Sequence, residues 1–275
     1  MTSPKQSNPL SPTVTEDEIQ RSEQDDFGVH YSDDGHRLLR FPEDAGSHLR
    51  EYAVPEGVTV ICDNAFEGCE GLRTVRLPRS LRVIGNLAFD SCERLERLDL
   101  PEGLLAIGKN VWVNCERLTL IAIPSTVRII GANPFYRSAV KTLMVASPRF
   151  AHSDGCLIDV EEKRLISVFD TPDEFITPAG LEIIGEDAFH ELRRMKRLIV
   201  SEGVRELHRF AVVGCPSLQS VTLPPSVGYL SPSAFSFCIN LHDVTIPRSV
   251  SPDIVKPLSE AIKTEAGSGA RVVRT

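Results

Sequence analysis

The sequence predicts a repeat solenoid, in which the chain winds into stacked coils, and two observations support this prediction. Residues 55–77, 78–100 and 101–123 are consecutive stretches of 23 residues with the same residue types in the same positions. A second array with this pattern starts at Pro178. A fixed period of this kind is typical of repeat proteins, whose units stack because none can bury its apolar face alone.

Each stretch predicts one coil with three parts, and the second stretch shows them clearly. Residues 95–100 alternate inward and outward as a strand does, and one such strand per coil gives a parallel β-sheet. Residues 81–84 form a second short extended piece. The sequence Ala88-Phe89-x-x-Cys92 predicts a single helical turn that places an aromatic ring in the core. Pro78 ends the preceding strand because it cannot donate a ladder hydrogen bond.

The first part of the chain predicts three segments. Residues 1–26 are rich in Ser, Pro, Thr, Gln and acids, and we expect a disordered acidic tail. Residues 27–54 predict an N-terminal capping hairpin around Ser32-Asp33-Asp34-Gly35, because Asp-Gly between alternating apolar residues favours a tight turn. Residues 55–145 then form repeats one to four.

The period breaks at residues 146–177, which predict an inserted β-hairpin. Residues 155–169 align without gaps with residues 28–42. The chain therefore consists of two arrays, each of which begins with the same hairpin. Residues 178–250 supply repeats five to seven and a partial eighth.

Two further segments are expected at the C-terminal end. The apolar residues of 251–264 follow a helical spacing and predict a capping helix. Such a helix would cover the apolar end of the last coil, which a terminal repeat must hide. Residues 265–275 are expected to form a flexible tail.

The composition and net charge limit the classes of partner that the chain is expected to bind. With 41% hydrophobic residues, 25% charged residues and a net charge of −8, the chain is a globular protein that binds nucleic acid or anionic membrane poorly. No apolar run reaches the roughly 18 residues of a membrane span. The N-terminus has no apolar core of a signal peptide. If the chain is full length, we expect it in the cytoplasm.

The seven cysteines predict packing rather than redox or metal chemistry. Cys69, Cys92 and Cys115 are 23 residues apart, as are Cys215 and Cys238, so each group forms a column with one thiol per coil. No C-x-x-C pair is present, and free cysteine behaves as a small buried hydrophobe. We therefore expect reduced thiols, no metal and no cofactor.

Residues 55–250 follow the pattern P-x-x-[VL]-x-x-I-x-x-x-A-F-x-x-C-x-x-L-x-x-[VL]-x-[LI]. This pattern resembles the BspA-like leucine-rich repeats of bacterial and protozoan proteins. The resemblance implies a right-handed coil or horseshoe with a parallel β-sheet. It also implies binding to other proteins and adhesion, often at the cell surface, and it brings no catalytic residues.

The sequence lacks the common catalytic motifs. It contains no G-x-S-x-G, H-E-x-x-H, G-x-x-x-x-G-K-[ST] or G-x-G-x-x-G. His152, Asp154 and Cys156 lie close together at the insert, where a Cys-His pair would be a nucleophile. A polar turn that leads into a strand explains them more simply. An enzyme with a site at the inserted hairpin is therefore a remote alternative.

The outward face of the predicted sheet supplies a candidate binding site. Ala122, Met144 and Ile199 occupy the same outward slot in successive repeats. The other residues of this candidate are Leu120 in the neighbouring outward column and the cations Lys141, Lys196 and Arg197. An apolar patch rimmed by charge favours binding of an acidic or mixed protein segment. Two alternatives stay open: the inserted hairpin covers the patch, or the charges form a solvated face.

We therefore expect a non-catalytic scaffold of about seven coils, interrupted by one hairpin, that binds a partner protein on the exposed face of its sheet. The main alternative is a cell-surface adhesin whose export signal lies outside this chain. The sequence predicts neither the partner's identity nor the oligomeric state.

Overall fold

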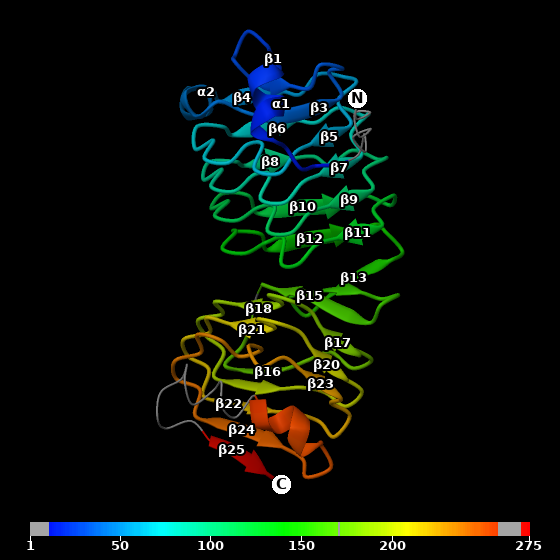
Figure 1. The fold of residues 1–275 in the computed structure, drawn as a ribbon, viewed down its shortest axis with the longest axis vertical. Coiled ribbons are helices and arrows are strands. Elements are labelled where there is room, and N and C mark those ends of the chain that lie inside the picture. Colours follow the sequence, from blue (N-terminus) through cyan, green and yellow to red (C-terminus); the bar gives the residue numbers. More distant parts are fainter. Residues whose placement is uncertain (1–10, 170, 258–270) are drawn as a thin grey trace, which may run out of the picture. The chain divides into compact units, whose positions relative to one another are not determined.

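The computed structural model describes residues 11–169, 171–257 and 271–275. It divides the chain into two compact units, Met1–Pro148 and Arg149–Thr275. Figure 1 shows that each unit is a stack of coils whose short strands lie side by side. Parallel pairing of strands from successive coils confirms the predicted solenoid in both units.

Unit 1 has sheets on two sides of its coils. The seven-stranded sheet consists of β1 (Glu23–Gln24), β2 (His30–Tyr31), β3 (Arg37–Arg40), β5 (Val60–Ile61), β7 (Val83–Ile84), β9 (Ala106–Ile107) and β11 (Ile129–Ile130). The other side carries β4 (Glu51–Ala53), β6 (Thr74–Arg76) and β8 (Arg97–Leu98), followed by the pair β10 (Leu120–Ile123) and β12 (Thr142–Val145). Two short helices precede the first coil, α1 (Glu16–Arg21) and α2 (Glu43–His48).

Unit 2 repeats this plan. Its six-stranded sheet consists of β13 (Phe150–Ser153), β14 (Cys156–Asp159), β15 (Arg164–Val168), β17 (Ile183–Ile184), β20 (Glu206–Leu207) and β23 (Tyr229–Leu230). The five-stranded sheet consists of β16 (Glu174–Ile176), β19 (Arg197–Ile199), β22 (Ser220–Thr222), β24 (Asp243–Ile246) and β25 (Arg271–Arg274). A third, two-stranded sheet pairs β18 (Phe189–His190) with β21 (Val212–Val213).

The two units begin with the same hairpin, as the alignment of residues 28–42 with 155–169 predicts. In unit 1, Tyr31 lies opposite Leu38, and the register shifts at the preceding residue of β2. In unit 2, the aligned residues Ile158 and Leu165 lie opposite each other, with the same shift in β14. Each hairpin's second strand then pairs in parallel with the first coil of its unit. The insert is thus the first element of unit 2.

Stacked aromatic rings fill the core at the predicted positions. Phe66, Phe89 and Trp112 are fully buried. The rings of Phe66 and Phe89 lie 4.9 Å apart at 9°, and those of Trp112 and Phe135 lie 5.4 Å apart at 9°. In these two pairs, the ring of one coil rests on the ring of the next, an arrangement worth about 0.5–1.5 kcal/mol per pair beyond its buried area.

The predicted helical turn at residues 88–92 is wrong. This part of the coil is a chain of tight turns, in which the amide of Cys92 donates to Phe89 O. Leu87 and Ser91 have φ of 54° and 57°, values that a right-handed helix excludes. The turn instead bonds to the next coil, because Phe89 N donates to Val111 O at 3.0 Å. Coils are thereby tied together on a third side.

The columns of cysteine thiols also tie successive coils together. All seven cysteines are buried free thiols. In unit 1, the Cys92 thiol donates to Phe66 O and the Cys115 thiol to Phe89 O, both at 3.2 Å. Burial raises the pKa of Cys92 well above its usual value. These thiols are packing groups that also satisfy a carbonyl of the preceding coil.

Both tails depart from expectation. Residues 11–26 are ordered, with helix α1 and strand β1, so the prediction of a disordered tail is wrong there. Arg271–Arg274 form β25, which pairs in parallel with β24, so a flexible tail is wrong for these residues. Within the predicted capping helix, residues 252–257 are helical and Val255 is buried. Residues 1–10 and 258–270 lie outside the described part of the chain.

Glycine follows the buried Ile of several coils because the coils approach closely there. A Cβ on Gly85, Gly108 or Gly131 would lie 2.5–2.6 Å from backbone atoms of the preceding coil. In unit 2, a Cβ on Gly185 would lie 2.8 Å from Leu165 O. Real Cβ atoms do not come this close, so the coil would have to shift. The glycine is a packing requirement that the apolar pattern alone does not reveal.

We expect Gly185→Ala to lower the free energy of unfolding by about 1–3 kcal/mol, the usual cost of overpacking a tight core. The matched control in the same unit is Gly228→Ala, whose Cβ would meet its nearest neighbour, Arg205 O, at 3.9 Å. The control should be neutral, or more stable by up to about 1 kcal/mol. Urea denaturation followed by circular dichroism measures both, and equal losses would contradict the close-approach argument.

Candidate functional site

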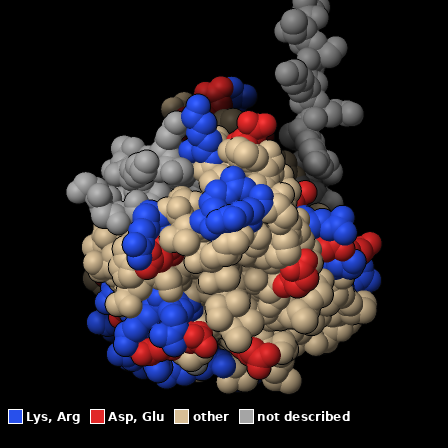
Figure 2. Space-filling view, turned by 90° about the horizontal axis from the view of Figure 1, so that it is seen from below, with Lys and Arg blue, Asp and Glu red and all other residues tan. Residues whose placement is uncertain are grey.

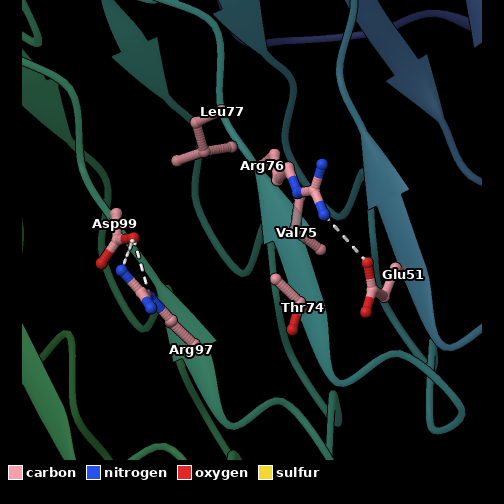
Figure 3. Close-up of a pocket in the computed structure, with 7 residues that line it drawn as sticks. All are labelled: Glu51, Thr74, Val75, Arg76, Leu77, Arg97 and Asp99. Atoms are coloured by element: carbon pink, nitrogen blue, oxygen red, sulfur yellow. Dashed lines mark hydrogen bonds and ion pairs between the residues drawn. The ribbon is translucent and has the colours of Figure 1, made fainter.

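Charged side chains cover the outward face of β4, β6 and β8 in unit 1. Arg76 Nη2 lies 3.1 Å from Glu51 Oε2, and Arg97 Nη2 lies 2.7 Å from Asp99 Oδ2. Figure 3 shows these two pairs on either side of an open pocket, with Thr74 between them. The pocket has a volume of about 470 Å³. It presents two cations and two anions and therefore carries no net charge.

The in-register pairing of the strands creates this arrangement. Thr74 lies opposite Glu51 on one side and opposite Arg97 on the other. Successive residues of a strand alternate faces, so Thr74 and Arg76 point outward while Val75 is buried between them. The four charged side chains are each well exposed. Exposed ion pairs of this kind contribute little to stability and are available to an approaching partner.

An apolar surface follows on the next two coils. Leu120 is 47% exposed and Met144 is 58% exposed. Ala122 lies opposite Met144 in the parallel pair β10–β12, and it is exposed as well. These are three of the predicted binding residues, and they share one outward face. Lys141, a fourth, lies just before β12 and is exposed.

The remaining predicted residues lie in unit 2, on a different sheet. Ile199 is only partly exposed, and its neighbours in the register are Ile176 and Thr222. The prediction that Ala122, Met144 and Ile199 lie on three successive coils is therefore wrong, because strand β16 of the insert occupies the place before β19. Ile176 is 58% exposed, and the sequence analysis missed it.

The predicted cations of unit 2 are paired within the chain. Lys196 Nζ lies 2.8 Å from Asp173 Oδ2, and Arg197 Nε lies 2.6 Å from Glu174 Oε2. Both acids stand 23 residues before their partners, so the period itself was the signal that could have identified them. In the view of Figure 2, several groups of Lys and Arg likewise lie against Asp and Glu. Lys196 and Arg197 therefore do not form a rim of unpaired cations.

The insert does not assemble a nucleophile. His152 lies opposite Leu157 in the β13–β14 pair, so it projects from the opposite face of the hairpin to Cys156. The His152 ring stacks on Phe169 at 5.4 Å. Cys156 is fully buried, and burial raises the pKa of its thiol to about 12. A protonated, shielded thiol facing away from the imidazole supports the interpretation as a turn that leads into a strand.

Among residues 11–169, 171–257 and 271–275, no group of three or more His, Cys, Asp or Glu side chains is placed to hold a metal ion. No helix in the same residues has the length and apolar character needed to cross a membrane.

Comparison with known proteins identifies the class. The family model for the BspA-type leucine-rich repeat region matches residues 45–151 and 171–253 in six copies. No curated protein matches the chain. Three solved structures share the fold, and at their low identities the likeness shows the fold alone.

The first is a leucine-rich cell surface protein from Faecalibacterium prausnitzii A2-165, with TM-score 0.51 and 22% identity over 86% of this chain. This chain spans 65% of that protein's length. A leucine-rich repeat protein from Eubacterium ventriosum ATCC 27560 has TM-score 0.56 and 17% identity, covering 85% of this chain and 73% of its own. A leucine-rich repeat protein from Bacteroides ovatus ATCC 8483 has TM-score 0.50 and 17% identity, covering 97% of this chain and 71% of its own.

Stacked parallel coils, a repeating apolar core and an outward face of variable side chains define a leucine-rich-repeat scaffold. The family match covers well over half of the sequence. The chain belongs to the BspA-type leucine-rich repeat family, as the 23-residue pattern indicates.

The pairing of Lys196 with Asp173 can be tested by titration. A hydrogen bond and the charge of Lys196 lower the pKa of the Asp173 carboxyl below its usual value. Lys196→Gln removes both effects, so the pKa of Asp173 should rise. Arg193→Gln is the control, because this neighbouring exposed cation is not among the causes of the shift. NMR titration of the side-chain carboxyl measures both variants, and an unchanged pKa in Lys196→Gln would refute the pairing.

Proposed function

We propose that the chain is a non-catalytic scaffold that binds a partner protein on the outward face of unit 1. The observation that carries this proposal is the exposed apolar surface of Leu120, Ala122 and Met144 on paired strands. Apolar side chains exposed side by side are uncommon on a surface that serves only solubility.

The neighbouring charged face supports the same proposal. Coils two and three are stacked, since β7 pairs with β9 and Phe89 N donates to Val111 O. Arg97 and Asp99 on coil two are therefore followed by Leu120 and Ala122 at the equivalent positions of coil three. An apolar centre bordered by polar, ion-paired residues matches the core and rim of a protein–protein interface. The mixed charge favours a partner segment with both signs over a strongly acidic one.

A cell-surface adhesin is the second candidate. The Faecalibacterium relative is named a cell surface protein, and this supports the candidate by analogy of fold. Antibody labelling of intact cells of the producing organism distinguishes the two candidates. Labelling without permeabilisation would favour the adhesin, whereas labelling only after permeabilisation would favour an internal scaffold.

The double substitution Leu120→Asp and Met144→Asp tests the main proposal. A partner captured by the wild-type protein and then purified should bind the variant at least tenfold more weakly, because two carboxylates enter an apolar contact. The thermal midpoint should stay nearly unchanged, since both side chains are about half exposed.

Ile239→Asp is the matched control. Ile239 is 63% exposed, and it lies in unit 2, outside the face of β10 and β12. The control should retain the affinity of the wild-type protein in isothermal titration. The proposal fails if the double variant keeps full affinity, or if the control loses as much as the double variant.

A further inference from the structure

The N-terminal segment Ser11–Arg21, here called the clasp, lies against the seven-stranded sheet of unit 1. Its two apolar side chains, Val14 and Ile19, pack on a small cluster formed by Leu39, Val60 and Cys62. This cluster is separate from the main core of the coils. The clasp is thus an added layer on the outer face of the sheet, opposite to the side chains that fill the solenoid.

Polar contacts fix the clasp at one point. Arg37 is only 6% exposed, and its guanidinium donates to Glu18 Oε1 at 2.5 Å and to Thr13 O at 2.6 Å. Asp63 N donates to Pro12 O at 2.9 Å. The Nε atom of Arg37 is buried without a hydrogen-bond partner in the described part of the chain. The sheet therefore presents a buried cation whose charge is met by one carboxylate of the clasp.

The clasp itself resembles a bound ligand more than a part of the fold. Its helix α1 has six residues, and none of them is buried. A helix of this length is marginal in water without the surface on which it packs. The buried residues belong to the sheet beneath the clasp: Leu39 is 2% exposed, and Val60 and Cys62 are not exposed at all. The clasp hides an apolar site while contributing few buried groups of its own.

The apolar row under the clasp continues past it. Val60, Val83, Ala106 and Ile129 occupy equivalent positions on four strands paired in register. Val83 still packs against the clasp cluster, whereas Ile129 at the far end is 62% exposed. Leu105 beside this row is 39% exposed. The surface that holds the clasp is therefore longer than the clasp.

We propose that the clasp is a built-in pseudo-ligand, and that this row with Arg37 at its end is a docking site for an acidic amphipathic segment of a partner protein. The chemistry of the occupant follows from the clasp, which places two apolar side chains on the sheet and a carboxylate on Arg37. The first turn of α1 is wholly acidic. This site lies on a different sheet from the proposed interface at Leu120 and Met144.

A partner segment must displace the clasp to bind. The apparent affinity is then reduced by the fraction of molecules in which the clasp is open. Any change that weakens the contact of Glu18 with Arg37 raises that fraction and should tighten binding. Cys62 reports the opening directly, because its thiol lies under the clasp and burial raises its pKa to about 12. Alkylation requires an accessible thiolate, so it should be slow until the clasp opens.

The test compares Glu18→Gln with Glu16→Gln in the full-length chain. Both variants lose one carboxylate from the first turn of α1, but of these two side chains it is Glu18 that forms the ion pair with Arg37. We expect iodoacetamide to modify Cys62 at least tenfold faster in Glu18→Gln, and within twofold of wild type in Glu16→Gln. Mass spectrometry resolves each cysteine, and Cys115 serves as the internal control for unfolding. Unchanged labelling at Cys62, or equal acceleration at Cys115, would overturn the proposal.

Docking is measured with a fluorescent synthetic peptide of residues 11–22. Fluorescence anisotropy should show at least tenfold tighter binding to full-length Glu18→Gln than to the wild-type chain. A peptide with Lys in place of its three acids, at positions 16, 17 and 18, should not bind. If Cys62 is exposed in Glu18→Gln and the acidic peptide still fails to bind, the site is only a structural contact and the proposal is wrong.

Discussion

The close approach of successive coils is the constraint on which the rest of the structure depends. Parallel strands lie about 4.8 Å apart, and every part of a coil must keep that distance from its neighbour. Backbone hydrogen bonds hold the coils together on several sides, as at Gly108 N to Ile84 O and at Phe89 N to Val111 O. Glycines at the tightest points and flat rings in the interior are the residues that permit this spacing.

The same constraint separates packing from function. Inward positions are committed to rings, aliphatic side chains and thiols, and the raised pKa of the buried Cys92 thiol illustrates how inert such groups become. Chemistry that reaches a partner is left to the outward positions, which the stacking does not restrict. This is why Arg97 and Leu120, at equivalent positions of neighbouring coils, can differ so completely. A scaffold of this kind varies its surface without disturbing its core.

The sequence predicted what the period controls. The core positions, the recurrent hairpin and the outward placement of Leu120, Ala122 and Met144 all follow from residues that recur at a constant interval. The tight turns could not be predicted in this way, because the spacing of apolar residues does not indicate the left-handed backbone of Leu87 and Ser91. The pairing of Lys196 was missed because the interpretation of residues 146–177 as a break in the period hides the 23-residue spacing between Asp173 and Lys196. Two apolar side chains, one ion pair and hydrogen bonds to the carbonyls of Pro12 and Thr13 hold the clasp, and these contacts are too few for composition to reveal.

Departures from the repeat are therefore the most informative positions in this chain. Cys62 stands where the following coils carry Gly85, Gly108 and Gly131. A side chain is excluded at those glycines by the backbone of the coil before them. Before Cys62 there is no coil but the hairpin strand β3, and the thiol packs against Leu39 under the clasp. A preceding hairpin strand does not by itself remove this limit, because Gly185 also follows a hairpin strand and a Cβ there would lie 2.8 Å from Leu165 O. The thiol at position 62 is therefore a departure particular to the first coil, and it contributes to the apolar cluster on which the clasp packs.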